Sequence, residues 1–280
     1  AGLALGAGVD GVELNAGQHS LIRQFLSGLT NFRGDEWGPG DDGSGRIRFA
    51  VAVLKRVRQA MGDDGILGLR LSCDELAPWA GLTPESATKL PAELAPLVDY
   101  LVVVRGSIYS ADATTPDGHT AAGFNLDLAR RVAERVGGLT LVVAQGSVVD
   151  PAQAAAALAD GGIGLVEMTR AQIADPDLAT KIVAGDAAAV RPCLLCNQRC
   201  RVRDGRNPIV SCTVNPTAGY EHSEHEGTTD RAREQGRVHV VGAGPAGLEL
   251  ARLAAGAGLD VTVHDRLDRP GGIVPDWPIA

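Results

Sequence analysis

Four cysteines lie close together in the sequence, at Cys193, Cys196, Cys200 and Cys212. Thiolates repel one another, so gathering four of them is costly unless a cation neutralises them, and the spacing therefore predicts a metal site. A compact run of three with a later fourth favours a [4Fe-4S] cluster held in a loop. A structural zinc site remains an alternative, although zinc ribbons more often show two Cys-x-x-Cys pairs. A disulfide framework is disfavoured, because no signal peptide is recognisable and the first 190 residues hold only Cys73.

A second chemical signal is the glycine-rich stretch Gly242-Ala-Gly244-Pro-Ala-Gly247. An apolar strand is predicted before it, at 237–241, and a helix after it, and the next strand ends at Asp265. This context predicts a dinucleotide site, with the pyrophosphate at the helix N-terminus and the Asp265 carboxylate on a ribose hydroxyl.

The elements before the cysteines alternate between short apolar strands and amphipathic helices. Such alternation predicts a parallel sheet covered on both faces. Five strand–helix units do not decide between an eight-stranded barrel and an open doubly wound sheet. The predicted strands are residues 9–14, 66–71, 100–104, 139–144 and 165–168, and the predicted helices are 47–61, 85–97, 126–136, 151–159 and 176–184.

Polar or glycine residues follow each predicted strand at its carboxyl end. For any single one, an ordinary surface loop is the simpler interpretation. The repetition at five strand ends favours a (β/α)₈ barrel, whose last two loops commonly hold a phosphate. These residues are Asn15 and Gln18, Arg70 and Ser72, Arg105 and Gly106, Gln145 and Gly146, and Thr169 and Arg170.

Composition excludes several classes of protein. The chain has 280 residues and a net charge of −8 with no Lys/Arg-rich run, which argues against nucleic acid or an anionic membrane as a partner. No stretch approaches the roughly twenty apolar residues of a membrane span, so we expect no membrane insertion and a cytoplasmic location. Residues 201–236 are polar and aperiodic, and we interpret His222 and His225 there as solvated linker histidines.

Several motifs together resemble the old yellow enzyme family. They are Asp10-Gly-Val-Glu-Leu, Gln24-Phe-Leu-Ser, Thr30-Asn-Phe-Arg-Gly-Asp-Glu-Trp-Gly and Arg46-Ile-Arg-Phe. The cysteine pattern, the following Val214-Asn-Pro and the Gly242 motif resemble the multidomain branch that contains 2,4-dienoyl-CoA reductase and trimethylamine dehydrogenase.

The resemblance implies an α/β chain in four parts. Residues 1–190 would form the C-terminal part of an FMN-binding TIM (β/α)₈ barrel, about strands 4–8, and residues 191–220 a [4Fe-4S] segment. Residues 221–236 would be a linker, and 237–280 the start of a Rossmann-like FAD/NAD(P)-binding domain. On this interpretation the chain is a fragment, and we expect it to be aggregation-prone and inactive when expressed alone.

The resemblance also implies roles for particular residues. Arg70 would contact the pyrimidine edge of the flavin, although a strand-end arginine paired with Asp74 or Glu75 is the simpler alternative. Gly146, Ser147 and Arg170 would hold the FMN phosphate, and the four cysteines would bind the cluster.

The substrate positions depart from the family pattern. Asn15 and Gln18 stand where histidine or another polar residue is common, and their amides can still hydrogen-bond a carbonyl oxygen. Ser20 replaces a tyrosine proton donor and is a poor acid, which leaves His19 and Tyr109 as candidate donors. These departures weigh against dienoyl-CoA and trimethylamine as substrates.

The activity that the resemblance implies is an NAD(P)H:flavin oxidoreductase of the ene-reductase or dienoyl-CoA reductase kind. Electrons would pass between FMN, the cluster and a second dinucleotide site in the C-terminal domain, which would hold FAD or ADP. The alternatives are an amine or alcohol dehydrogenase that reduces a protein acceptor, and a non-redox binding protein with a zinc-stapled barrel. The expected partners are a small unsaturated carbonyl, thioester or amine, and either a second copy of the chain or an electron-transfer protein.

Overall fold

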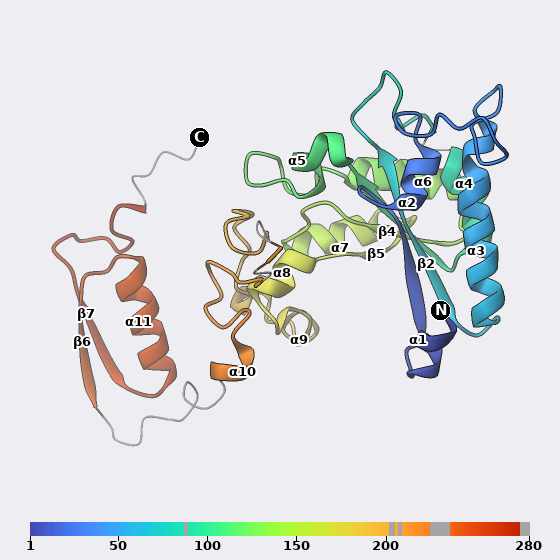
Figure 1. The fold of residues 1–280 in the computed structure, drawn as a ribbon. Coiled ribbons are helices and arrows are strands. Elements are labelled where there is room, and N and C mark those ends of the chain that lie inside the picture. The colour runs from blue at the N-terminus through green and yellow to red at the C-terminus, as the bar shows by residue number, and fades with distance from the viewer. Residues whose placement is uncertain (87–88, 202–204, 207–208, 225–235, 275–280) are drawn as a thin grey trace. The chain divides into compact units, whose positions relative to one another are not determined.

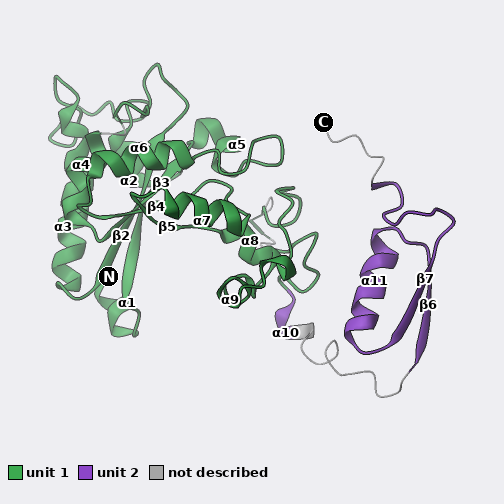
Figure 2. Cartoon of the chain, turned by 180° about the vertical axis from the view of Figure 1, so that it is seen from behind, with its two compact units in different colours: residues 1–219 green, residues 220–280 purple. Residues whose placement is uncertain are grey.

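The computed structural model describes residues 1–86, 89–201, 205–206, 209–224 and 236–274. The chain divides into two compact units, Ala1–Gly219 and Tyr220–Ala280 (Figure 2). His225 and most of the predicted linker lie outside the described residues. The boundaries of the four parts predicted from the sequence stay a prediction.

The elements of the first unit alternate between strands and helices along the chain (Figure 1). The strands are β1 (Gly11–Ala16), β2 (Ile66–Asp74), β3 (Tyr100–Arg105), β4 (Leu141–Ala144) and β5 (Ile163–Val166). The helices are α1 (Gly2–Gly6), α2 (Leu21–Leu26), α3 (Arg48–Met61), α4 (Lys89–Leu94), α5 (Ala111–Thr114), α6 (Leu126–Val136), α7 (Pro151–Ala159), α8 (Thr169–Ala174) and α9 (Leu178–Val183). Short 3₁₀ turns are η1 (Ser44–Ile47), η3 (Ala95–Leu97), η4 (Ile108–Ser110) and η5 (Ala187–Ala189).

The five strands form one parallel sheet in the consecutive order β1-β2-β3-β4-β5. A doubly wound sheet reverses its strand order at a switch point, whereas a barrel adds each strand beside the one before it. The consecutive order therefore decides the question that the sequence left open, and the α/β fold of a barrel arc is confirmed.

The helices that build the main core pack on one face of this sheet. Alternate strand residues point to opposite faces, so Leu69 on β2 and Leu101 on β3 join a core with residues of α3, α6 and α7. Val102 and Val104 on β3 belong to a separate cluster on the other face, with Val143 of β4. In the described residues the helices of the main core lie on one face, as consecutive right-handed crossovers require, and the predicted cover of both faces stays a prediction.

Several predicted elements agree with the structure and several do not. Helices 126–136 and 151–159 were predicted with their observed bounds. Strand β2 continues to Asp74, so Arg70 lies inside the strand and not at its end. The predicted helix 176–184 is α9, and the short helix α8 before it was not predicted; the chain is extended at Asp175, between the two. The predicted helix 85–97 is α4 followed by a 3₁₀ turn.

The second unit begins with α10 (Glu221–Glu224) and continues as strand, turn, helix and strand. Strands β6 (Arg237–Val241) and β7 (Asp260–His264) pair in parallel, and α11 (Pro245–Gly256) connects them. This is the start of a Rossmann-like unit, as predicted from the glycine motif.

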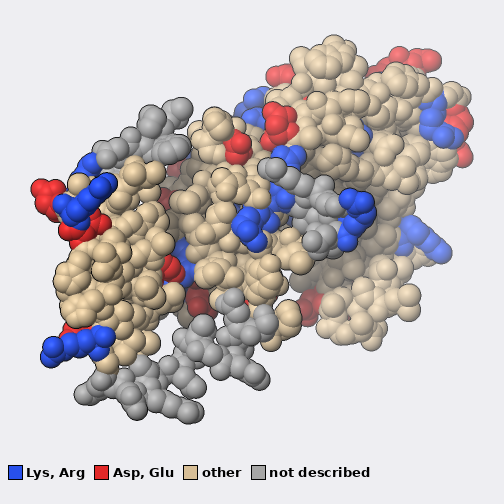
Figure 3. Space-filling model, turned by 60° about the vertical axis from the view of Figure 1, so that its left-hand side comes forward, with Lys and Arg blue, Asp and Glu red and all other residues tan. Residues whose placement is uncertain are grey.

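Two surface properties bear on the expected partners. No helix of the described residues has the length and apolar character needed to cross a membrane. On the face shown in Figure 3, acidic and basic side chains of the described residues are interspersed and form no continuous basic surface. The predicted absence of a nucleic-acid partner is in keeping with this distribution and stays a prediction.

Candidate functional site

The loop after β4 is shaped by a buried amide. Asn125 donates from Nδ2 to the Val103 carbonyl at 3.0 Å and to the Gln145 carbonyl at 2.9 Å, which ties the ends of β3 and β4 together. Gly146 follows with φ +145°, and a Cβ there would lie 2.5 Å from Asn125 Cβ. Only glycine fits this position without displacing Asn125.

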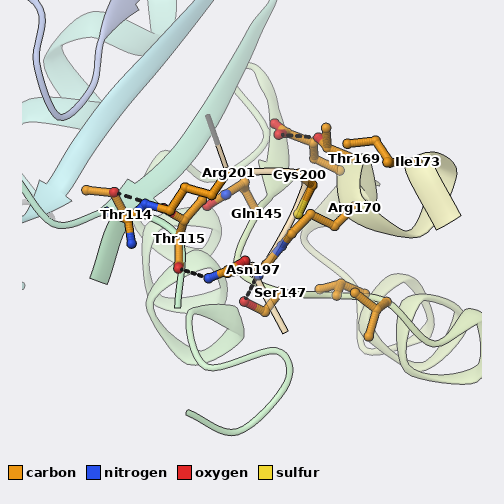
Figure 4. A pocket seen from close by; sticks show the side chains of 13 residues that line it. Thr114, Thr115, Gln145, Ser147, Thr169, Arg170, Ile173, Asn197, Cys200 and Arg201 are labelled. Carbon is orange, nitrogen blue, oxygen red and sulfur yellow. Dashed lines mark hydrogen bonds between the residues drawn. The ribbon is translucent and has the colours of Figure 1, made fainter. Parts of the chain in front are cut away.

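Arg170, the second residue of α8, joins three loops. Its Nη2 donates to Ser147 Oγ at 2.5 Å, and its Nη1 donates to Asn197 Oδ1 and to the Pro116 carbonyl, each at 2.7 Å. Asn197 in turn donates to the Thr115 carbonyl at 2.6 Å. Figure 4 shows these side chains converging on one cavity. The loops after β3, β4 and β5 therefore meet the cysteine segment at a single guanidinium.

A cavity of about 240 Å³ opens beside this junction. A guanidinium and a hydroxyl held beside a glycine turn are suitable donors for a phosphate monoester. Ser147 has φ +58°, a strained value for a residue with a side chain, and such strain often accompanies a binding loop. The residues present therefore fit the FMN phosphate. The cavity lining includes Gln145, Ser147, Glu167, Thr169, Arg170 and Cys200.

Arg70 lies on the inner face of the arc, the face opposite the main core. Its Nε donates to Glu13 Oε1 and its Nη2 donates to Glu167 Oε2, each at 2.7 Å. Burial lowers the pKa of Arg70, but hydrogen bonds and charge attraction from Glu167 and Glu13 outweigh it, so the pKa lies above its usual value.

The simpler alternative for Arg70, a pair with Asp74 or Glu75, is wrong. Asp74 faces Arg105, with Oδ2 3.1 Å from Nε. Glu75 is fully buried and pairs with Arg23. The actual partners come from β1 and from the residue after β5, which local sequence spacing could not indicate.

The cysteine segment is held against the arc by asparagines and by its own backbone. Asn215 donates to the Ile173 carbonyl at 2.9 Å, and Asn197 contacts Arg170 and Thr115 as described. The Ser211 N–H donates to the Arg199 carbonyl at 3.2 Å, and Arg199 Nε donates to Ser211 Oγ at 3.0 Å. This pairing brings the later part of the segment, with Cys212, alongside the run from Cys193 to Cys200.

All four thiols are free and half-buried. Burial raises the pKa of Cys193 most strongly; the Leu195 N–H and Arg170 oppose that rise, and the charges of Cys212 and Cys196 add to it. Burial also raises the pKa of Cys200. The charge of Arg170 lowers this pKa, and the charges of Cys193 and Cys196 raise it further. Charge repulsion thus links Cys193 to the other three thiols and Cys200 to Cys196.

The fit of a metal group to the cysteine segment rests on its four thiols and on the local backbone. Leu195 N–H donates to Cys193 Sγ at 3.4 Å, the kind of N–H···S contact that stabilises a thiolate. Leu195 and Asn197, on either side of Cys196, have φ of +52° and +50°. Within the described residues, no three His, Cys, Asp or Glu side chains converge as a ready site for a metal ion.

The proposed substrate amides lie at the carboxyl end of β1. Asn15 lies inside β1, and its Oδ1 accepts from the Gly17 N–H at 2.7 Å. Gln18 Nε2 donates to the Arg105 carbonyl at 3.2 Å, which connects this loop to the end of β3. Asn15 Nδ2 and Gln18 Oε1 take no hydrogen bond to another described residue, so these two atoms are available to a ligand.

The candidate proton donors are not brought together with the amides by any hydrogen bond among the described residues. His19 is exposed, and Tyr109 is 64% exposed in η4 after β3. Ser20 has a structural role, because its Oγ accepts from the Arg23 N–H at 3.1 Å and caps α2.

The second unit presents its candidate site through the backbone. A Cβ on Gly247 would lie 1.9 Å from the Gly242 carbonyl oxygen, so only glycine fits at this position in the first turn of α11. Asp265 Oδ2 accepts from the Ala243 N–H at 2.5 Å and Oδ1 accepts from Leu267 at 2.8 Å. The Ala243 and Leu267 contacts lower the pKa of Asp265. Asp265 thus shapes the glycine loop itself, and its predicted contact with a ribose stays a prediction.

Four residues of the first unit's site were missed by the sequence reasoning. Asn125, Glu167, Asn197 and Asn215 position other groups and belong to no motif with a recognised chemical role. Their positions in the sequence could have indicated two of them. Asn197 lies within the cysteine run, and Glu167 precedes Thr169 and Arg170 at a strand end.

Comparisons with known proteins agree with this geometry. Residues 1–188 match the NADH:flavin oxidoreductase / NADH oxidase family, and residues 240–279 match an NAD(P)-binding Rossmann-like domain. A solved structure of 2-naphthoyl-CoA reductase in complex with 2-naphthoyl-CoA superimposes with a TM-score of 0.87 at 33% identity, and covers 97% of this chain and 40% of that chain.

Curated relatives carry different activities. The chain is 34% identical over 266 residues to a metal reductase of Desulforamulus reducens, covering 95% of this chain and 39% of the relative. It is 36% identical over 272 residues to a probable N-methylproline demethylase of Rhizobium meliloti, with the same coverage of 95% and 39%. The chain therefore spans about two fifths of the length of these relatives.

Proposed function

Because the chain belongs to the NADH:flavin oxidoreductase / NADH oxidase family, we propose that the protein is a flavin and iron–sulfur oxidoreductase. It would take electrons from NAD(P)H and deliver them to a small unsaturated carbonyl or thioester. FMN would bind at the arc, a [4Fe-4S] cluster at the cysteine segment, and FAD or the ADP part of a dinucleotide at the second unit.

The observation that carries this proposal is the Arg170 junction. One guanidinium contacts Ser147 of the phosphate loop and Asn197 of the cysteine segment, each within hydrogen-bond distance. A phosphate-bound flavin and a cluster held by the cysteines would therefore occupy adjoining sites. Short separation suits electron exchange between a two-electron and a one-electron carrier.

The chain's own residues divide the remaining work. Ser147 and Arg170 would hold the phosphate, and Gly146 would let the backbone approach it. Arg70 would hold the pyrimidine edge, where a fixed cation favours negative charge. When bound, FMN supplies the hydride chemistry. Asn15 Nδ2 would donate to a substrate oxygen beside Gln18, and His19 or Tyr109 would supply a proton.

Cys193, Cys196, Cys200 and Cys212 would each bind one iron of the cluster. Zinc at these cysteines is the competing assignment, and it would make the segment a structural support for the arc. In the second unit, Gly242, Gly244 and Gly247 would face the pyrophosphate, with Asp265 fixing their loop. We further propose a cytoplasmic location and either self-association or an electron-transfer protein as partner.

A second candidate function is oxidative demethylation or dehydrogenation of an amine. The 36% identity to a probable N-methylproline demethylase favours it. The flavin would then oxidise the substrate instead of reducing it. On this candidate, electrons would leave through the cysteine segment to a protein acceptor.

The test is to titrate the full-length gene product, purified without oxygen, and to follow its absorption spectrum. We expect NADH or NADPH to bleach the flavin band and a simple enone or unsaturated thioester to restore it. Bleaching by an N-methylated amino acid, with none by NAD(P)H, would establish the amine candidate. A colourless protein that contains zinc would refute both and support the non-redox alternative.

A further inference from the structure

The inner face of the arc carries a chain of charges of which the proposed function uses only Arg70. Arg70 on β2 reaches Glu13 on β1 and Glu167 directly after β5, each at 2.7 Å. Glu13 lies in the first strand of the five-stranded sheet and Glu167 follows the last one. Arg70 therefore spans the inner face from one edge of the arc to the other.

Each carboxylate is itself held in place. Tyr100 OH donates to Glu13 Oε2 at 3.2 Å, and Thr169 Oγ1 donates to Glu167 Oε1 at 2.9 Å. The Glu167 N–H donates to the Ala144 carbonyl at 2.9 Å, which continues the β4–β5 pairing by one residue. Glu167 is thus fixed at the backbone and at both carboxylate oxygens.

These charges are shielded from solvent enough to act on one another. The side chains of Arg70, Glu13 and Glu167 are 23%, 28% and 27% exposed, and they share the inner face with Val102, Val104 and Val143. Charges beside an apolar surface interact more strongly than charges in water. Their formal charges sum to −1, since one guanidinium faces two carboxylates.

Of the two carboxylates, only Glu167 is among the cavity-lining residues, with Ser147, Arg170 and Cys200. Arg70 does not line the cavity itself and is joined to it through Glu167, whose negative charge opposes the cation of Arg70. The arginine alone would favour a negatively charged, reduced flavin, and Glu167 would reduce that preference.

We propose that Glu167 is a positioning residue that holds Arg70 across the arc and sets the flavin midpoint potential below the value that Arg70 alone would give. This inference rests on the proposed function, since it needs a bound flavin with its pyrimidine edge at Arg70. Glu167 contacts the cavity, and it acts on the flavin through Arg70 and through its own charge.

The test compares the midpoint potential of the flavin in the full-length gene product and in three variants. Glu167→Gln keeps the length of the side chain and an oxygen for Arg70 but removes the charge, so the midpoint should move to a more positive potential. Glu167→Asp keeps the charge and should stay near the wild-type value. Asp160→Asn is the matched control, because it removes a carboxylate that pairs with Arg130 on the outer surface, 2.8 Å apart.

The outcomes separate this inference from the proposed function. Wild-type protein without flavin would refute the proposed function and this inference with it. A flavin-loaded Glu167→Gln variant whose midpoint matches that of Asp160→Asn would overturn the inference alone. Loss of flavin from Glu167→Gln would also overturn it, since the residue would then act in binding and not in setting the potential.

Discussion

The two units build their candidate sites in different ways. In the first unit, side chains hold one another in place: Arg170 contacts Ser147 and Asn197, and Arg70 contacts Glu13 and Glu167. In the second unit, the site consists mainly of backbone at glycine residues. Gly247 packs against the Gly242 carbonyl, and Asp265 accepts from the Ala243 N–H.

Mutations should therefore disrupt the two sites in different ways. A site made of side chains can lose one group while the sheet beneath it stays folded, because the main core lies on the opposite face. A site made of tightly packed backbone has no group to remove. It is lost by adding atoms, and its loss is a loss of local structure.

The largest effect should come from adding a methyl group to the second unit. In Gly247→Ala the new Cβ would lie 1.9 Å from the Gly242 oxygen, so the turn must open. We expect a destabilisation of about 3 kcal/mol, at the upper end for overpacking, and loss of ADP binding by calorimetry. Gly256→Ala is the matched control, since a Cβ there meets no atom within 4 Å. Equal melting and equal ADP affinity in both variants would contradict a backbone-built site.

The next effect is the removal of the junction in the first unit. Arg170→Ala loses hydrogen bonds to Ser147, Asn197 and Pro116 and removes the cation expected at the phosphate. A hydrogen bond to a charged group is worth about 1.5–3 kcal/mol, so FMN affinity should fall roughly ten- to a hundredfold. The far-ultraviolet circular dichroism should not change. Arg130→Ala removes an arginine from the outer surface of α6, and FMN affinity should survive it; equal losses in both variants would argue against a specific phosphate contact.

A smaller effect is expected inside the arc. Arg70→Ala removes the cation and leaves Glu13 and Glu167 without their shared partner. Flavin should bind more weakly, by about 1–3 kcal/mol, and its midpoint potential should move to more negative values. Potentiometric titration measures the shift. An unchanged midpoint would mean that Arg70 is only a structural link between the edge strands.

The sequence predicted the site of the second unit more completely than that of the first. The second unit's motif is local, so the strand, glycine turn, helix and strand were predicted together with their positions. The cysteine run was also read directly from its spacing. In the first unit, helices α6 and α7 were predicted at their observed bounds. Helix α6 has a regular apolar period, and α7 begins with Asp150 as its N-cap followed by a proline.

The partners of side chains in the first unit could not be predicted. Arg70 was predicted at a strand end, with Asp74 or Glu75 as the alternative to a flavin contact, but its protein partners lie 57 and 97 residues away. Asn125 and Asn197 likewise act on loops that meet only when the sheet forms. Such contacts depend on register and strand order, which an isolated sequence pattern does not specify.

The smallest predicted effect is a dependence on pH. Asp175 Oδ2 accepts from Lys181 Nζ and from the Arg191 N–H, each at 2.7 Å, and fixes the chain just before the cysteine segment. Burial raises the pKa of Asp175, but Lys181 and the backbone N–H groups lower it further, so the net pKa lies below its usual value.

A depressed pKa means that Asp175 stabilises the fold above the pKa of an unfolded aspartate, about 3.9, and that this contribution is lost as pH falls through the folded value. Asp175→Asn should therefore lower stability by about 1 kcal/mol near neutral pH and by progressively less below about pH 4. Thermal melts across this range measure the difference. A constant difference between the variant and the wild type at every pH would contradict the assignment.

The central claim is that the arc holds a flavin beside an iron–sulfur cluster on the cysteine segment. The most direct measurement is the iron, acid-labile sulfide, zinc and FMN content of the full-length gene product purified without oxygen. The account predicts about four iron and four sulfide per chain, as a four-iron cluster requires, together with FMN and no stoichiometric zinc. Zinc in place of iron, or a chain that binds neither FMN nor iron, would contradict it.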